Sequence, residues 1–290
     1  TVREAVGDAV GPEPTATETI GEMGSIDLRM GVRWYLARAV EPELRRDLLR
    51  QHFVRFQNET WPSMPLSKFG GKTAREAAAD PNNHRLLLAW LMSVEELIDT
   101  SSFDRIDLDP LRRELGLPER GRLEPAGLNL DRLPPYRFSR LNFAALSDDQ
   151  LTRLMHIARF VGHPYVIRQL IGLKLERSGG ALPPREEYEL RMQRAMMSPH
   201  VAEGRADFER MEQIREGAEV PRGMHLVWLL DWALGRGAVD LLEKTMETLQ
   251  RRHFQEPGIA DQVARILVRH GVISPEALAR GEFAPGSAHH

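Results

Sequence analysis

The amino-acid sequence predicts an all-α protein, in which an N-terminal helical unit is followed by irregular antiparallel helical hairpins arranged as a solenoid or a bundle. From residue 26 onward, apolar residues recur at spacings of three and four, which is the period of an amphipathic helix. No segment combines apolar–polar alternation with enrichment in β-branched residues, as half-buried strands do. Short stretches rich in Gly or Pro separate the helical segments of the C-terminal half, and such short connectors are typical of antiparallel neighbours.

Residues 1–24 are predicted to be a flexible arm, because they hold Gly, Pro, Thr and Glu with few large apolar side chains. A helix is expected over 26–40. Pro42 suits the first position of the next helix, which we expect to end near Asn58. The prolines within 61–65 predict an extended or turn segment, since proline disfavours helix in the residue that precedes it.

An N-terminal helical unit is predicted over 25–117. The Thr-Ala-Arg-Glu sequence at 73–76 is a capping box, in which the Thr and Glu side chains satisfy backbone amides at the start of a helix. Asp-Pro pairs at 80–81 and 109–110 begin two further helices, and the second of these is expected to stop at Gly116.

Residues 118–135 hold several Pro and Gly and are predicted to be a connector, followed by a helical-hairpin repeat domain over 136–280. The segment 136–143 is expected to be a strand or an extended crossover, and 147–150 forms a second capping box. Residues 281–290 are expected to be a tail that ends in a tag remnant, and the start at Thr rather than Met indicates an excised or processed chain. The predicted helices of this domain are 148–161, 164–177, 184–197, 203–216, 222–234, 237–253, 257–270 and 274–280.

The composition excludes several classes of protein. The 290 residues include no Cys, which removes disulfides, thiolate zinc sites and cysteine nucleophiles. A formal net charge of −3 argues against a protein that grips nucleic acid, because that needs a basic surface. No apolar run approaches the ~18 residues that would span a bilayer, and no signal segment is recognised, so we expect a cytoplasmic protein.

The segment Phe69-Gly-Gly-Lys-Thr73 suggests a phosphate-binding loop, but the spacing is wrong. That motif needs a Gly five residues before Gly71, and the residue there is Leu66. We therefore expect the two glycines, Gly70 and Gly71, to form a tight turn before the helix that Thr73 caps.

The same stretch carries a family resemblance. Trp61, the pair at 65–66, the segment 69–78 with its Gly-Gly-Lys-Thr-x-Arg-Glu-Ala-Ala sequence, and the pair at 80–81 resemble a motif of uncharacterised bacterial helical proteins with tetratricopeptide-like arrays. A weaker similarity is to the toxin-binding module of ParS/Xre-type antitoxins, in which Pro usually follows the Thr. The first resemblance is favoured, and it implies a helical interaction protein without a known catalytic residue.

Histidines do not show the spacing of a helical zinc site, so no metal is expected. His156, His163, His253 and His270 fall near predicted helix ends, where they would stabilise the helix dipole.

Four residues at 225–232 have two interpretations. His225, Trp228, Asp231 and Trp232 could form the wall of a pocket, with the two Trp side chains on one side of their helix. Alternatively, Asp231 is a buried partner of an arginine on the next hairpin, such as Arg236 or Arg265, and we favour this interpretation. No nucleophile motif accompanies them.

Acidic pairs at 95–96, 148–149 and 186–187 are interpreted as solvated helix faces or helix N-terminal charge, not as shared-proton dyads. An arginine series at 45–55 makes one helix basic on its outer side, but neighbouring acids dilute the charge, so a nucleic-acid patch is not favoured.

We expect a non-catalytic interaction protein that binds a protein or peptide partner in a helical groove, without a cofactor or a catalytic residue. An antitoxin-like regulator that binds a toxin or nucleic acid through 61–81 is one alternative, although no helix-turn-helix precedes that segment. A helical enzyme with a pocket near His225 and Asp231 is another, and homo-oligomer formation stays open. The candidate binding residues are Trp61, Phe69, Gly70, Gly71, Lys72, His225, Trp228, Asp231 and Trp232.

Overall fold

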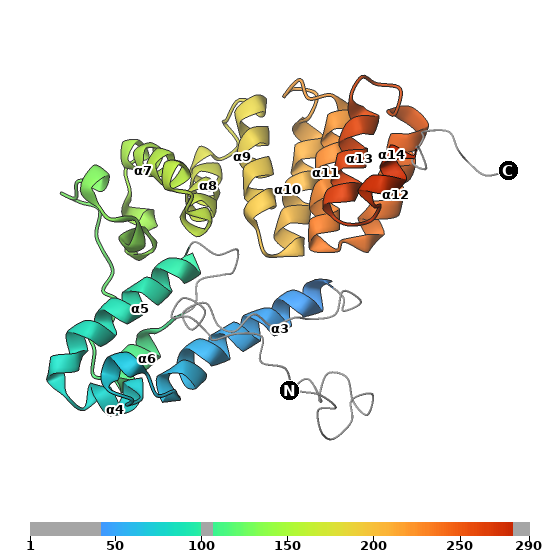
Figure 1. Ribbon diagram of the computed structural model, residues 1–290. Coiled ribbons are helices and arrows are strands. Elements are labelled where there is room, and N and C mark those ends of the chain that lie inside the picture. Colours follow the sequence, from blue (N-terminus) through green and yellow to red (C-terminus); the bar gives the residue numbers. More distant parts are fainter. Residues whose placement is uncertain (1–41, 100–106, 281–290) are drawn as a thin grey trace, which may run out of the picture.

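The computed structural model describes residues 42–99 and 107–280, and it confirms the all-α class (Figure 1). Within these ranges the β pairing consists of one isolated parallel bridge, between Leu123 and Leu141. The expectations for the arm, for the helix at 26–40 and for the tail at 281–290 fall outside the described residues.

The first described helix, α3 (Pro42–Arg55), continues into a π-helical turn (Phe56–Thr60) and a 3-10 turn (Trp61–Ser63). The segment at 61–65 thus begins as a turn, one of its two predicted forms, but Trp61 keeps helical dihedral angles, φ −64° and ψ −33°, although Pro62 follows it. The Trp61 side chain is completely buried, and its packing outweighs the local preference against helix before proline. Met64, which precedes Pro65, is extended as expected.

Three short or medium helices complete the first core: α4 (Ala74–Ala78), α5 (His84–Asp99) and α6 (Asp109–Glu114). The predicted capping box is confirmed, because the Thr73 hydroxyl accepts the Glu76 amide and the Glu76 carboxylate accepts the Thr73 amide. Glu95, interpreted from the sequence as solvated, is instead buried and accepts two hydrogen bonds of 3.0 and 2.9 Å from Arg112.

The Pro/Gly-rich connector runs against both parts of the chain. Arg112 donates to the Pro118 carbonyl (2.9 Å), and Arg120 donates to the Ser139 hydroxyl (2.6 Å). The segment expected to be a strand or crossover is mainly a 3-10 helix (Pro135–Arg140). Because most of this segment is helical, its β pairing among the described residues is limited to the bridge between Leu141 and Leu123.

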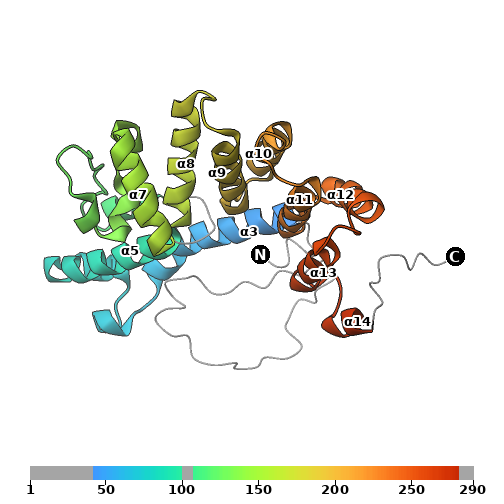
Figure 2. The same ribbon diagram turned by 90° about the horizontal axis from the view of Figure 1, so that it is seen from above.

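The remaining helices follow one another in chain order. Both views show α7 to α12 side by side in a row, and α13 contacts α11 (Figures 1 and 2). Helices α3 and α5 lie along one side of that row (Figure 1). The bounds are α7 (Asp148–Val161), α8 (Pro164–Ser178), α9 (Pro184–Met197), α10 (Val201–Ile214), α11 (Arg222–Arg236), α12 (Val239–Arg252), α13 (Ile259–Arg269) and α14 (Pro275–Ala279).

Local signals place the first of these helices where the sequence predicts it. The Ser147 capping box is confirmed, with Gln150 as its reciprocal partner. Gly162 ends α7 in the left-handed region, with φ 70°, which glycine adopts without strain. None of the helices in the described residues is long and apolar enough to cross a membrane.

Candidate functional site

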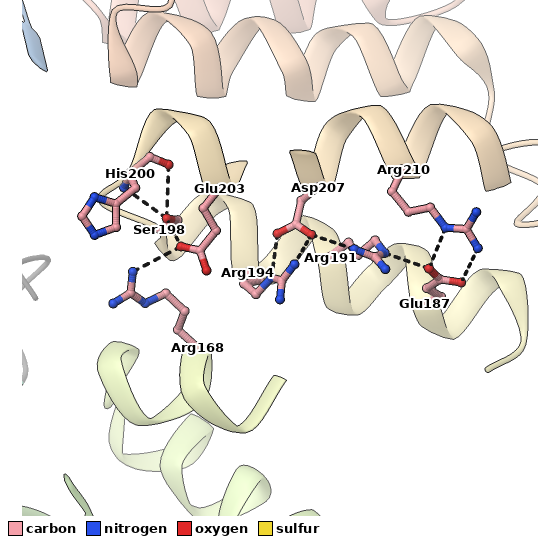
Figure 3. Close-up of polar contacts among 9 residues, drawn as sticks. All are labelled: Arg168, Glu187, Arg191, Arg194, Ser198, His200, Glu203, Asp207 and Arg210. Atoms are coloured by element: carbon pink, nitrogen blue, oxygen red, sulfur yellow. Dashed lines mark hydrogen bonds and ion pairs between the residues drawn. The ribbon is translucent and has the colours of Figure 1, made fainter. Parts of the chain in front are cut away.

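Beside an Arg168–Glu203 pair between α8 and α10, an ion-pair network joins α9 and α10 (Figure 3). At its centre is Asp207 of α10, whose side chain is 0% exposed. The carboxylate accepts one hydrogen bond from Arg191 (3.0 Å) and two from Arg194 (2.7 and 2.6 Å), both on α9. A buried carboxylate is stable only with such charged partners, so the rotation of α9 against α10 is fixed here.

Glu187, one turn before Arg191, extends the network along α9. It is buried and accepts hydrogen bonds from Arg210 (3.0 Å) and Arg191 (2.8 Å). Hydrogen bonding from Arg210, followed by that from Arg191, lowers the pKa of Glu187, against the opposing effect of burial. The interpretation of 186–187 as a solvated pair is therefore wrong for Glu187, because arginines from two helices cover it.

A hollow of about 550 Å³ lies between α8, α9 and α10, and Arg191 and Arg194 of this network line it. Arg168 of α8 lies 3.3 Å from the Glu203 carboxylate, which also accepts a hydrogen bond from Ser198. The wall of the hollow holds three arginines and two glutamates, Arg168, Arg191, Arg194, Glu176 and Glu203, and the Asp207 carboxylate pairs with both Arg191 and Arg194. Because these charges balance, the hollow has no excess positive charge to attract an anion.

A second hollow, of about 580 Å³, opens on the face formed by α7, α9 and α11, with one lysine from α8. Three methionines and a tryptophan supply most of its apolar wall. Unbranched, polarisable methionine side chains adapt to partners of different shape. We call this the methionine groove, and its lining is Met155, Arg159, Lys174, Glu186, Glu189, Leu190, Met192, Gln193, Met196 and Trp228.

The polar residues of the methionine groove are mostly paired with one another. Lys174 donates to Glu186 (2.5 Å), and Glu189 accepts from Arg185 (2.6 Å). Arg159 instead donates to the neutral amide oxygen of Gln193, at 2.6 and 3.2 Å. Among the described residues that line this groove, Arg159 is thus the cation without a carboxylate partner, because the Gln193 side chain carries no charge.

His225 faces a different, smaller hollow of about 280 Å³ between α10, α11 and α12. Its Nδ1 lies 2.8 Å from the Tyr188 hydroxyl, and its Nε2 lies 3.4 Å from Glu212. We call this the histidine pocket, and its lining is Arg205, Phe208, Glu209, Glu212, Arg222, His225, Leu226, Leu229, Leu241, Lys244, Thr245 and Thr248.

Burial dominates the charge state of His225. Desolvation lowers the pKa of His225 to about 4, although Glu212 favours the charged form; Arg215 and Arg222 add smaller effects that favour the neutral form. His225 is therefore neutral at neutral pH. Burial also raises the pKa of its partner, Tyr188, well above the ordinary tyrosine value, so that hydroxyl stays protonated.

The other predicted residues of α11 do not share this pocket. Asp231 contacts α13, where it accepts from His270 (2.8 Å) and Arg269 (3.1 Å). An arginine partner was expected, but the two named candidates are wrong, because Asp231 faces the end of α13 and Arg269 is the arginine within reach. The candidates were Arg236, which donates to the Met196 carbonyl, and Arg265, which donates to the Asp261 carbonyl.

The two tryptophans of α11 also have separate surroundings. Trp228 lies in the methionine groove with its ring 6.1 Å from Tyr188. Trp232 is buried beside Phe208, at 5.2 Å between ring centroids. A Cβ added at Gly204 would lie 2.5 Å from the Trp232 ring, so this glycine allows α10 to approach α11.

The predicted binding residues at 61–72 lie in one part of the structure, but the two large side chains among them point inward. Trp61 and Phe69 are buried, while Gly70, Gly71 and Lys72 are exposed. The amides of both glycines donate within the turn, to the carbonyls of residues 67 and 66. These amides are therefore occupied, which agrees with a tight turn rather than a phosphate cradle.

Two of the histidines near helix ends, His253 and His270, each contact a carboxylate. His253 lies 2.5 Å from Glu256, and His270 contacts Asp231, so carboxylates hold both rings beyond any effect of the helix dipole. Within the described ranges, no group of three or more His, Asp or Glu side chains is arranged to hold a metal ion.

Comparison with known proteins yields little. No family model matches the chain, and no solved structure matches it. A stretch of 95 residues is 34% identical to 2,3-bisphosphoglycerate-independent phosphoglycerate mutase 1 of Methanothermobacter thermautotrophicus. This stretch is 30% of the chain and 22% of that enzyme, so the chain spans about a fifth of its length. Similarity over so small a part does not show a shared family.

Proposed function

We propose that the protein is a non-catalytic interaction module that binds a segment of another protein in the methionine groove. The observation that carries the proposal is the convergence of Met155, Met192, Met196 and Trp228 from three helices on one hollow of about 580 Å³. Flexible methionines around an aromatic side chain are typical of surfaces that accept apolar peptide side chains.

The charges of the groove indicate what the partner segment contains. The Lys174 ammonium is already neutralised by Glu186, whereas Arg159 is bonded to the neutral Gln193 side chain. A carboxylate of the partner would therefore gain most beside Arg159. We propose a segment with two or more large apolar side chains and a neighbouring Asp or Glu.

Selection from a displayed random peptide library tests this proposal. The wild-type chain should enrich peptides with apolar residues and an acidic neighbour, and their affinity is then measured by fluorescence anisotropy. Met192→Glu should weaken binding by at least about tenfold, because it puts a charge into the apolar wall at a cost above about 1.4 kcal/mol. Arg159→Gln should weaken acidic peptides more than their amide counterparts.

Val239→Glu is the matched control, since Val239 is 61% exposed on α12 and lies outside the groove. It introduces the same charge and should leave peptide affinity unchanged. The proposal fails if no peptide is enriched, or if Met192→Glu, shown to be folded by its circular dichroism and thermal transition, binds the peptides as well as Val239→Glu does.

A further inference from the structure

The histidine pocket has an apolar wall that the proposed function does not use. Phe208 comes from α10, Leu226 and Leu229 from α11, and Leu241 from α12, and they line the pocket together with His225. Its volume of about 280 Å³ is just below the ~300–1,000 Å³ range of small-molecule sites. The pocket therefore suits a ligand smaller than a typical cofactor.

One hydrogen-bond donor is available at the base of this pocket. Within the described part of the chain, the Tyr188 hydroxyl makes its hydrogen bond to His225 Nδ1, at 2.8 Å. Nδ1 is the acceptor that the hydroxyl contacts there, so we assign the donation to the hydroxyl and place the proton of the neutral imidazole on Nε2. The nearby Glu212 oxygen is 3.4 Å from Nε2, longer than a normal hydrogen bond. A hydrogen-bond acceptor on a ligand would therefore satisfy the Nε2–H group of His225.

The rim of the pocket is balanced in charge. Arg205 pairs with Asp240, at 2.8 and 2.9 Å, and Arg222 lies 3.5 Å from Glu212. The rim has one further exposed residue of each sign, Lys244 and Glu209. A charged ligand would lose its hydration without gaining an unmatched counter-charge, so the rim favours an uncharged ligand.

From these three observations we infer that the histidine pocket binds an uncharged, mainly apolar small molecule whose single hydrogen-bond acceptor contacts His225 Nε2. This site lies between α10, α11 and α12, and its lining shares no residue with the methionine groove. The two sites can therefore be tested separately on the same full chain.

The neutral naphthalene ketone dye Prodan is a suitable probe, because it combines an apolar ring system with one carbonyl acceptor. Wild-type protein should bind it saturably at one dye per chain, with a blue shift of its emission. Thr248→Phe adds a large side chain to the pocket wall and should weaken binding by at least about tenfold, a free-energy change of about 1.4 kcal/mol. His225→Phe removes the donor and should weaken binding by about two- to tenfold.

Glu247→Phe is the matched control for Thr248→Phe, since Glu247 is exposed on the same helix and does not line the pocket. It should leave the dissociation constant within about twofold, as should Met192→Glu in the methionine groove, both being smaller than the tenfold effect of about 1.4 kcal/mol. The anionic dye anilinonaphthalene sulfonate should bind at least about tenfold more weakly than Prodan.

Four results would overturn the inference. Wild type could fail to bind Prodan saturably, Thr248→Phe could bind it as well as Glu247→Phe, or the sulfonate dye could bind more tightly. Loss of Prodan binding in Met192→Glu would place the dye in the methionine groove instead. A failure of the peptide selection, in contrast, concerns only the proposed function, because the two sites share no lining residue.

Discussion

Acidification should weaken the fold through His225, and the size of the effect follows from its burial. The folded-state pKa of His225 is about 4, against an ordinary value of 6.5. Between these values the unfolded chain binds a proton that the folded chain excludes, so stability falls as the pH falls. Each pH unit costs about 1.4 kcal/mol, and the full loss between pH 6.5 and pH 4 is about 3 kcal/mol.

The groups packed around the imidazole determine this sign. Glu212 of α10 favours the charged ring, whereas Arg215 and Arg222 disfavour it, and the Tyr188 hydroxyl of α9 contacts Nδ1. Desolvation is the largest of these effects, which is why the net change lowers the pKa despite the nearby carboxylate.

The assay is urea unfolding followed by circular dichroism at several pH values from 7.5 to 4.5, on wild type and His225→Gln. Glutamine can still accept from Tyr188 but does not titrate, so other titrating groups cancel in the difference. Well above pH 6.5, where neither state binds this proton, the difference in free energy of unfolding should be constant. By pH 4.5 the free energy of unfolding of wild type should have fallen relative to the variant by about 2.5 kcal/mol. A difference that stays the same across this range would refute the buried, neutral histidine.

Three further changes test the packing. Asp207→Asn should lower the free energy of unfolding in urea by about 3 kcal/mol, because it leaves arginines without their buried partner, and a loss below about 1 kcal/mol would contradict that account. Gly204→Ala should lower the temperature of the thermal transition, since its Cβ would lie 2.5 Å from the Trp232 ring. Gly172→Ala, whose Cβ would lie 3.8 Å from the nearest side-chain atom, should instead raise stability by up to about 1 kcal/mol. Equal effects of the two substitutions would contradict this account of the helix contact. Thr73→Ala should cost about 1 kcal/mol in the same unfolding assay through loss of the capping box, and no loss would show that the box does not stabilise α4.

The helices and their ends could be predicted from the sequence because their causes are local. Ser147 with Gln150 begins α7 and Gly162 ends it, within one stretch of chain. At Trp61, in contrast, the neighbouring residues do not predict the backbone conformation. Its dihedral angles are set by a completely buried side chain, and the preference against helix before Pro62 is weaker than that packing.

The candidate sites were harder to predict, because they depend on residues that only the fold brings together. Met192 and Met196 are four apart, which predicts an apolar stripe on one helix face. Their meeting with Met155 and Trp228 requires three helices in register. His225 was among the predicted binding residues, yet Asp231 contacts α13, because six positions along a helix place the two side chains on different sides.

The burial of one side of α9 cannot be recognised from the sequence of that helix alone. Its composition is mostly polar, so the pattern alone indicates an exposed helix. Glu187, Arg191 and Arg194 nevertheless lie against α10, because Asp207 and Arg210 supply the opposite charges.

This pairing also explains how α9 presents the methionine groove. With its charged side held by α10, the opposite side of the helix, including Met192 and Met196, is directed towards α7 and α11. Apolar packing alone would tolerate several rotations of such a helix, whereas paired buried charges penalise every rotation that separates them. The ion-pair network therefore acts as a positioning device for the groove, and a variant that loosens it should weaken peptide binding even though none of its central carboxylates lines the groove.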